Sequence, residues 1–472
     1  MARRIDIDPV TRIEGHARVL VDLDDQDKVS FAGLVVNELR GFERILVGMQ
    51  ADRMPLVTAR ICGVCPSAHH LVAVKAIENG CQIVIPEAAR LQRQLLYMGH
   101  FIHSHAASLF ALTGPELFFG LGADPAKMNI SGLVAAQPDF ARKALRLRSL
   151  GQKINEAVGG RGIHPVTAVI GGMASDLSEE QRGELARLAD EALALVLELT
   201  SAVRDLLFQR MEESELLGKG MTQTTAYLGT AADGQIDFYD GELRLVAPDG
   251  RLLRSFSCGD YDTLLIERAT SWSYMKPVFV AWQGKEGVFR VGPLARLNVV
   301  DGLDTERAQA ELESFRQRFG HPCHLTYAQL YARLIELIHA CEKAVRLAAE
   351  PELTGPARQA VRLSSGRCVG HIEAPRGTLF HDYVIDERGI VRKANLLVAT
   401  QQNFAAINRS IQQAVEGTWQ GEVDAKVLNA IEFAIRTYDP CLSCATHAVG
   451  QMPMVVELSR SGQPVGRCSR EV

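Results

Sequence analysis

The sequence predicts a mainly helical fold with small β elements near each end of the chain. Apolar residues recur at three- and four-residue steps in several long segments, which is typical of amphipathic helices. Strict alternation is confined to short runs bounded by turn residues. Of the 472 residues 47% are hydrophobic and 23% charged, so the composition permits a large buried core. We find no internal repeat and no low-complexity linker.

The first predicted element is a β-hairpin or small sheet at the N-terminal end. Ala17, Val19, Val21 and Leu23 alternate with polar neighbours. A turn follows at residues 24–27, and strand character resumes over residues 29–36.

The helical body begins near residue 44, and its regular spacing includes Leu91, Leu95, Met98 and Ile102. Ser178 and Gln181 fit a capping box that opens a long helix reaching about Met211. A turn-rich stretch over residues 225–260 predicts an inserted β region. Later elements follow in order: helices over 304–319 and 325–349, a C-terminal β patch around 386–389, and helices over roughly 402–415 and 424–437.

Charge and hydropathy exclude several classes of protein. The formal net charge is −5, without the basic stripe that a nucleic-acid partner would require. Arg3 and Arg4 lead into acidic residues and a proline instead of an apolar run, which argues against a secretory signal. No stretch reaches the ~18 apolar residues of a membrane span. We therefore expect a cytoplasmic chain with no direct membrane insertion.

The ten cysteines fall into two groups. Six are scattered singly, and we expect them to act as small buried hydrophobes: Cys81, Cys258, Cys323, Cys341, Cys368 and Cys468. The other four form two Cys-x-x-Cys pairs, each followed by a histidine: Cys62 and Cys65 before His69, and Cys441 and Cys444 before His447.

A Cys-x-x-Cys turn points two sulfurs at one centre, which suits soft metals. Cys65 and Cys441 are 376 positions apart, whereas zinc modules recruit ligands within a few tens of residues. From spacing alone three interpretations stay open: a shared catalytic metal, structural zinc, or two unrelated pairs. If the pairs share a metal, the whole fold must close around it.

The two segments that contain the cysteine pairs resemble the signature motifs of the nickel–iron hydrogenase large subunit. Other segments resemble further motifs of that family in the same order along the chain: Asp8 to His16, Arg40 to Glu43, His164-Pro165 with Gly171-Gly172, and Glu373 to Gly377. The resemblance covers essentially the whole chain. It implies a hydrogenase large-subunit-like helical core in a single domain over residues 1–447.

The resemblance also implies a ligand set. Cys62, Cys65, Cys441 and Cys444 would bind nickel, and Cys65 and Cys444 would bridge to an iron that carries carbon monoxide and two cyanides. Glu43, His447 and the backbone carbonyl of Leu396 would hold a magnesium or similar divalent ion. His69 would hydrogen-bond a bridging sulfur, and Thr400 would contact a cyanide.

Three residues would carry the chemistry that this resemblance implies. Heterolytic cleavage of dihydrogen needs a Lewis-acidic metal and a nearby base. The thiolate of Cys441 would be that base, because metal binding keeps it deprotonated. Glu14 would carry the proton away, and Arg376 would stand over the open metal position in an electrostatic and steric role.

Two differences from many relatives indicate a branch of the family. Ser104 takes the place of an acidic residue, and Ala399-Thr400 replaces Pro-Ser. With residues 272–276 and 292–296, these features resemble the cytoplasmic branch that feeds soluble pyridine nucleotides. The branch coupled to deazaflavin or heterodisulfide reduction shares much of the same sequence and is the alternative.

The resemblance further implies processing and partners. A maturation protease would cut between His447 and Ala448 and remove residues 448–472. The chain carries no further cysteine cluster, dinucleotide fingerprint or flavin motif, so we expect no iron–sulfur cluster or flavin in it. Electrons would leave through an iron–sulfur small subunit, then through diaphorase subunits that carry flavin and bind NAD. We expect no nucleic-acid partner.

Two rival classes make different predictions. A quinone-coupled relative of respiratory complex I would share the fold but lack the cysteine pairs, which this chain retains. A structural zinc scaffold would contain zinc alone. Nickel and iron in roughly equal amounts would identify the hydrogenase.

Overall fold

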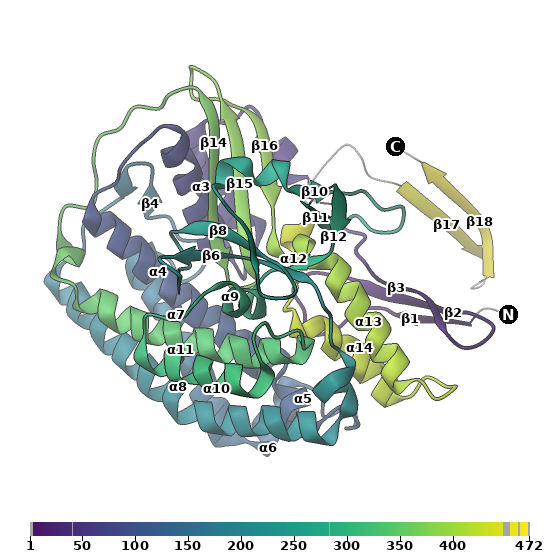
Figure 1. The fold of residues 1–472 in the computed structure, drawn as a ribbon. Helices are drawn as coiled ribbons and strands as arrows, with labels where there is room; N and C mark the ends of the chain where they lie inside the picture. Colours follow the sequence, from purple (N-terminus) through teal and green to yellow (C-terminus); the bar gives the residue numbers. More distant parts are fainter. Residues whose placement is uncertain (1–2, 40, 283, 447–453, 461–462, 471–472) are drawn as a thin grey trace.

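The computed structural model describes residues 3–39, 41–282, 284–446, 454–460 and 463–470 (Figure 1). Arg40, His447 and Ala448, which carry predictions made above, lie outside the described residues. Beyond residue 453 only the backbone of two strands is described, so the prediction for the thiol of Cys468 also falls outside.

Long helices form the body of the molecule, and in Figure 1 most of them lie side by side as one thick layer. Helix α4 packs against α7 and α11, and α8 packs against the same two helices. The predicted apolar face of α4 is confirmed, because Leu91, Leu95, Met98 and Ile102 are all buried. The long helices are α3 (Pro66–Gly80), α4 (Glu87–Ala106), α7 (Pro138–Gly159), α8 (Glu179–Glu213), α10 (Glu306–Phe319) and α11 (Gln329–Ala349).

The predicted capping box opens α8. The hydroxyl of Ser178 accepts from the amide of Gln181 at 3.2 Å, and the Gln181 side chain accepts from the amide of Ser178 at 2.9 Å. Two of the free amides at the helix start are thereby satisfied.

The remaining helices include the predicted C-terminal helical pair, α13 and α14. They are α1 (Phe42–Leu46), α2 (Met54–Thr58), α5 (Gly114–Phe119), α6 (Ile130–Ala136), α9 (Pro293–Val299), α12 (Ala399–Gln402), α13 (Phe404–Thr418), α14 (Ala425–Thr437) and α15 (Leu442–Ala445).

The β elements form small separate sheets. The N-terminal sheet orders β1 (Arg3–Ile7), β2 (Arg18–Leu23) and β3 (Val29–Val35), all antiparallel. The C-terminal patch is the antiparallel meander β14 (Gly366–Ala374), β15 (Gly377–Ile385) and β16 (Val391–Leu397), packed on α3. Two further sheets are two-stranded: β4 (Ala168–Val169) pairs with β5 (Gly172–Met173), and β17 (Met454–Arg460) pairs with β18 (Gln463–Arg470).

The inserted β region is longer than the sequence predicts. Its first sheet contains β6 (Ala226–Ala232), β7 (Gln235–Ile236), β8 (Glu242–Val246), β9 (Leu252–Phe256) and β13 (Phe289–Arg290). Its second contains β10 (Leu265–Glu267), β11 (Val278–Trp282) and β12 (Lys285–Gly287). The strands after residue 260 were missed because strands of two to five residues carry almost no alternation. β1 was missed for the same reason.

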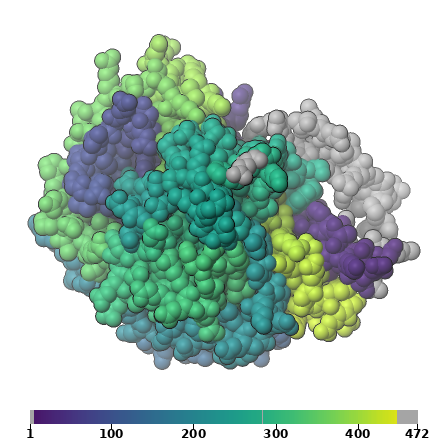
Figure 2. Space-filling view, in the orientation of Figure 1, coloured from purple at the N-terminus to yellow at the C-terminus, as the bar shows by residue number. Residues whose placement is uncertain are grey.

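The two ends of the sequence lie side by side. In Figures 1 and 2 the N-terminal strands border the helices α13 and α14. The amide of Leu34 in β3 donates to Asn408 of α13 at 2.9 Å. One apolar cluster includes residues from Ile5 to Ala445, and about half of the chain is helical. The predicted fold class, mainly α with small β elements, is confirmed.

Candidate metal centre

The first cysteine pair lies at the start of α3. Cys62 has an extended backbone, and Cys65 is the residue that caps α3, with Pro66 in its first turn. The amides of Val64 and Cys65 point back at the Cys62 sulfur, at 3.2 and 3.4 Å. Amide donors of this kind stabilise a thiolate.

The second pair lies where the chain leaves α14. Asp439 has a φ of +52°, and this sharp bend turns Cys441 inward as the cap of the short helix α15. The amide of Cys441 donates to the hydroxyl of Thr400 at 2.9 Å, which ties the pair to α12. Thr400 therefore lies beside Cys441; its predicted contact with a cyanide stays a prediction.

All four sulfurs meet in one buried cluster. Their ligand atoms lie within 4.8 Å of one another. The Sγ–Sγ separation is 3.1 Å for Cys62–Cys441, 3.1 Å for Cys65–Cys444 and 2.9 Å for Cys441–Cys444. None of these cysteines forms a disulfide, and each is at most 6% exposed. The predicted convergence of two pairs 376 positions apart is confirmed.

The donor set fits a soft metal ion. The four thiols are close together, form no disulfide and are shielded from water. Such a group binds thiophilic metal cations. Hydrogen bonds from the other three cysteines, Cys441 first, lower the pKa of Cys62 well below its ordinary value, and Arg376 adds to this effect. Burial raises the pKa of Cys441 and Cys444. Binding of a metal to all four would therefore release protons.

Glu14 touches the cluster directly. Its Oε2 lies 3.1 Å from the Sγ of Cys441 and accepts from the amide of Ser443 at 3.0 Å. The backbones of Glu14 and Cys441 pair as a parallel bridge, and the amide of Leu442 donates to the carbonyl of Glu14 at 3.1 Å. Gly15 permits this approach, because a Cβ there would lie 2.8 Å from the Cβ of Leu442.

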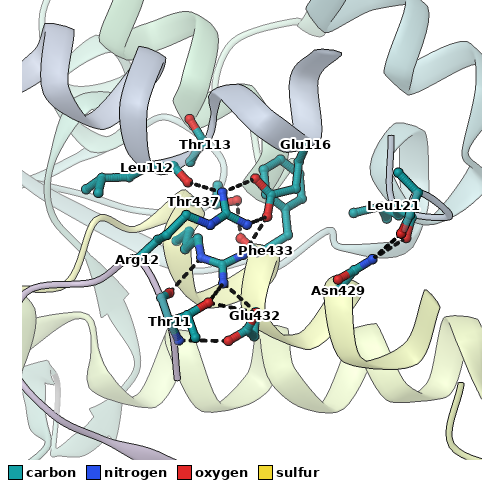
Figure 3. A network of polar contacts seen from close by, with 12 residues as sticks. Thr11, Arg12, Leu112, Thr113, Glu116, Leu121, Asn429, Glu432, Phe433 and Thr437 are labelled. Atoms are coloured by element: carbon teal, nitrogen blue, oxygen red, sulfur yellow. Dashed lines mark hydrogen bonds and ion pairs between the residues drawn. The ribbon is translucent and has the colours of Figure 1, made fainter. Parts of the chain in front are cut away.

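A polar clamp, with Arg436 and Glu116 buried at its centre, holds the segment that carries Glu14 (Figure 3). Arg436 of α14 donates to the carbonyl of Thr11 at 2.8 Å and to its hydroxyl at 2.7 Å. The carboxylate of Glu116 in α5 accepts a hydrogen bond from Arg436 at 2.5 Å. It also accepts from both terminal nitrogens of Arg12, at 2.5 and 2.8 Å. Glu432 accepts from the amide of Thr11 at 2.7 Å. The same helix therefore leads into Cys441 and fixes the approach of Glu14.

Arg376 lies in the turn between β14 and β15. It donates through Nε to the carbonyl of Asp439 at 2.6 Å and through Nη2 to its carboxylate at 2.9 Å. Its Nη1 is buried and has no hydrogen-bond partner among the residues that the structure describes. Burial alone would lower the pKa of Arg376, but Asp439 and then the thiolates of Cys441 and Cys65 raise it, so the guanidinium stays charged beside the sulfurs.

His69 lies beside the cluster, in the first turn of α3. Its Nε2 lies 3.4 Å from the Sγ of Cys444, and its Nδ1 lies 3.0 Å from Nε2 of His381. His381 Nδ1 in turn lies 2.6 Å from the hydroxyl of Tyr383. His69 thus lies beside the sulfur of Cys444, one of the two cysteines that the resemblance implies as bridging ligands; its hydrogen bond to a bridging sulfur stays a prediction.

The expected divalent-ion site is described only in part. Glu43 is 9% exposed, and its Oε1 accepts from the amide of Leu396 at 3.2 Å. It is the amide of Leu396, and not its carbonyl, that makes this contact with Glu43. His447 lies outside the described residues.

Sequence reasoning missed several residues that organise the site. Asp439, Glu116, Arg436 and His381 received no role, although all are buried. Asp439 had a visible signal, since an acidic residue directly precedes Pro440 and Cys441. The others had none, because their partners are remote in sequence.

The remaining described cysteines are free thiols outside the cluster. Cys323, Cys341 and Cys368 are buried, whereas Cys81 and Cys258 are partly exposed. Burial raises the pKa of Cys323 to about 11 and that of Cys368 to about 12. Low reactivity follows for these two.

Comparison with known proteins identifies matching families along most of the chain. The family described as nickel-dependent hydrogenase matches residues 40–127 and 236–447. A second family, described as HoxL-like, matches residues 4–39. In the described part of the chain, no helix is both long and apolar enough to cross a membrane.

Curated relatives match over nearly their full length. The vhu-type F420-non-reducing hydrogenase subunit of Methanocaldococcus jannaschii is 42% identical over 415 residues, which cover 88% of this chain and 99% of the relative. The NAD-reducing hydrogenase HoxS subunit beta of Cupriavidus necator is 38% identical, with 97% of each chain covered.

Solved structures share the fold. A chain of an NAD+-reducing [NiFe]-hydrogenase in the H2-reduced state superimposes with a TM-score of 0.90 at 37% identity, covering 94% of this chain and 99% of that one. The Ni-Fe-Se hydrogenase of D. vulgaris Hildenborough, at 22% identity and a TM-score of 0.77, shows the likeness of fold alone.

Proposed function

The chain belongs to the nickel-dependent hydrogenase family as a nickel–iron large subunit, and from this premise we propose that it catalyses the reversible heterolytic cleavage of dihydrogen to protons and electrons. The observation that carries the proposal is the meeting of four buried thiols, from opposite ends of the chain, within 4.8 Å.

The proposed cofactor is a nickel–iron centre that Cys62, Cys65, Cys441 and Cys444 would hold, with one carbon monoxide and two cyanides on its iron. When bound, this centre would supply the Lewis-acid and redox chemistry that polarises dihydrogen. The four sulfurs fix its place, and their burial excludes bulk water.

Proton movement is assigned to the chain's own residues. The sulfur of Cys441 receives the proton, and Oε2 of Glu14 takes it across the 3.1 Å that separate the two atoms. The amide of Ser443 holds that carboxylate in position. Arg376 places a permanent positive charge beside the sulfurs, and its buried Nη1 has no hydrogen-bond partner among the described residues.

A further part of the proposal concerns the surrounding ligands. Glu43, the carbonyl of Leu396 and His447 bind a magnesium or similar divalent ion, His69 donates to the sulfur of Cys444, and Thr400 contacts a cyanide. The burial of Glu43, His69 and Thr400 supports these roles.

We propose that electrons pass to an iron–sulfur small subunit, then through diaphorase subunits to NAD(P). The 38% identity to an NAD-reducing hydrogenase subunit over 97% of both chains supports this acceptor. The alternative is a different acceptor module, favoured by the 42% identity to a protein named F420-non-reducing hydrogenase. Assaying the purified complex for hydrogen-dependent reduction of NAD+ and NADP+ separates the two: reduction supports the first, and dye reduction without either supports the second.

The experiment that tests the main proposal uses the purified complex. We expect hydrogen-dependent reduction of a viologen dye, together with infrared bands from carbon monoxide and cyanide bound to iron. Absence of both the bands and the turnover from protein that contains its full complement of metal would refute the proposal.

We also propose that residues 448–472 are removed after nickel insertion by a protease that cuts between His447 and Ala448. A chain that retains this tail is expected to be inactive, because the tail extends the segment directly after the second cysteine pair. Mass spectrometry of active and inactive fractions tests this. Full turnover by protein whose mass still includes Ala448 to Val472 would contradict it.

A further inference from the structure

A fully buried ion network lies behind the turn that carries Arg376. Arg296 of α9 and Glu336 of α11 have side chains that are 0% exposed. Arg296 donates to both oxygens of Glu336 at 2.6 Å and to Glu373 of β14 at 2.9 Å. Charges buried this deeply require multiple partners, and the network provides them.

Arg296 also binds the backbone of the turn. Its Nη1 donates to the carbonyl of Ala374 at 2.9 Å, and its Nη2 donates to that of Pro375 at 3.2 Å. These are the two residues directly before Arg376. One rigid, planar guanidinium thus fixes the entry to the turn at two successive carbonyls.

The packing of two glycines presses the turn against the start of α9. A Cβ on Gly292, whose φ is +98°, would lie 2.8 Å from the carbonyl oxygen of Arg376. A Cβ on Gly377, whose φ is +133°, would lie 2.7 Å from the amide nitrogen of Gly292. The helix that carries Arg296 and the turn that carries Arg376 therefore meet backbone to backbone.

The other members of the network anchor it to the rest of the core. Glu336 also lies 2.9 Å from Nε2 of His105 in α4. Glu373 accepts from the hydroxyls of Thr230 at 2.9 Å and Thr378 at 2.7 Å. Helices α4, α9 and α11 and strands β6, β14 and β15 are thereby joined at one point behind the metal centre.

We infer that Arg296 is a positioning residue for the metal centre: it holds the turn so that Arg376 binds Asp439 with two nitrogens and keeps its positive charge beside the cysteine cluster. The inference rests on the proposed function, because it acts through the proposed role of Arg376. An ordinary core ion pair would have no such consequence, and the chain offers one for comparison. Arg93 binds Glu78 at 2.7 and 2.8 Å and the carbonyls of Val169 and Gly172, without contacting the turn or the cysteines.

The test compares three conservative variants of the assembled enzyme: R296K, R376K and the matched control R93K. Infrared bands of the iron-bound carbon monoxide and cyanides report the local field at the metal, and turnover is expressed per nickel. We expect R296K to shift the bands in the same direction as R376K and to lower turnover roughly tenfold or more, as misplacement of an active-site group does. R93K is expected to keep the bands of the unsubstituted enzyme.

Each other outcome is decisive. Unshifted bands and unchanged turnover per nickel in R296K, with shifted bands in R376K, would overturn the inference alone. Unshifted bands in R376K would refute the proposed role of Arg376, and absence of diatomic bands from the unsubstituted enzyme would refute the proposed function. If R296K does not accumulate, T378V decides, because it removes one hydroxyl from Glu373 and is expected to shift the bands the same way by less. No shift in T378V would then count against the inference.

Discussion

The short contact between Glu14 and Cys441 places a carboxylate against a buried sulfur. The contact is stabilised on the other side by the amide of Ser443. A carboxylate held at hydrogen-bond distance can accept a proton from the sulfur in a single transfer. From this geometry we hypothesise that protons leave the sulfur of Cys441 through the carboxylate of Glu14.

Substitution E14Q tests that hypothesis while preserving size and hydrogen-bonding shape. We expect turnover per nickel to fall about a hundredfold, because a general acid–base group contributes on that order or more. The infrared bands of the metal centre should remain, since no metal ligand is changed. The matched control is E38Q, at an exposed carboxylate paired with His16. Equal turnover per nickel in E14Q and E38Q would contradict the proposed proton path.

The roles of residues that stand in recognisable sequence motifs could be predicted. The roles of residues that depend on contacts with distant parts of the chain could not. The cysteines, Glu14, His69 and Arg376 stand in motifs that can be recognised from sequence. Asp439, which binds Arg376 across 63 positions, could not be paired with it, because nothing local dictates which loop meets which turn. Arg296 and Glu336 read as ordinary helix residues until their burial is known.

At the scale of elements, α14 joins two functions. Its last turn carries Arg436 and leads to Cys441, while Arg436 donates to Thr11 and Glu116. The Arg436 and Glu116 side chains are 0% and 1% exposed. Loss of Arg436 would leave Glu116 with Arg12 as its remaining cation and would remove hydrogen bonds from buried acceptors, a change that costs about 1–3 kcal/mol.

We therefore expect R436M to lower the free energy of unfolding by about 1–3 kcal/mol. It should also raise amide hydrogen exchange over residues 10–16, because the clamp on Thr11 is lost. Denaturant unfolding and hydrogen-exchange mass spectrometry measure the two effects. R93M, which removes another buried arginine, should also lower the free energy of unfolding and should leave exchange over residues 10–16 unchanged. Equal exchange in both variants would show that the clamp does not hold the Glu14 segment.

Elements with a strong periodic or capping signal were predicted well. The α8 start at Ser178 and the helices α10, α11, α13 and α14 lie within a few residues of their predicted bounds. The strands β10 to β13 were not predicted, since each is two to five residues long. The parallel pairing of β13 with β6 joins residues about 63 positions apart, and such contacts are set by the whole fold.

At the scale of the whole molecule, burial of neutral histidines makes stability depend on pH. Burial lowers the pKa of His70, His105 and His339 to about 4 each, from 6.5. Between these two values the unfolded chain binds more protons than the folded one. These groups therefore reduce stability as the pH falls from 6.5 toward 4, by about 2 kcal/mol for one such histidine at pH 5.

The melting temperature is thus expected to drop between pH 7 and pH 5. H339N should show a smaller drop than the unsubstituted chain, because it removes one of the titrating groups. Thermal unfolding followed by circular dichroism at both pH values measures the difference. A variant whose melting temperature falls as steeply as that of the unsubstituted chain would argue against this linkage.

The central claim also belongs to the whole molecule, because the metal centre exists only once the chain has closed. Sequence spacing alone left three interpretations open: a shared metal, structural zinc, or two unrelated pairs. The structure shows that the two cysteine pairs converge, because the starts of α3 and α15 meet at one cluster. The separation of 376 positions between Cys65 and Cys441 offers no local rule.

Metal quantification in the purified complex tests this claim most directly, with the unsubstituted enzyme compared with C65S from the first pair and C444S from the second. The account predicts one nickel per chain in the unsubstituted enzyme, with iron in excess of nickel because the clusters of the small subunit add to it, and loss of the nickel in each variant. Zinc in place of nickel, or full nickel retained when either pair is broken, would contradict it.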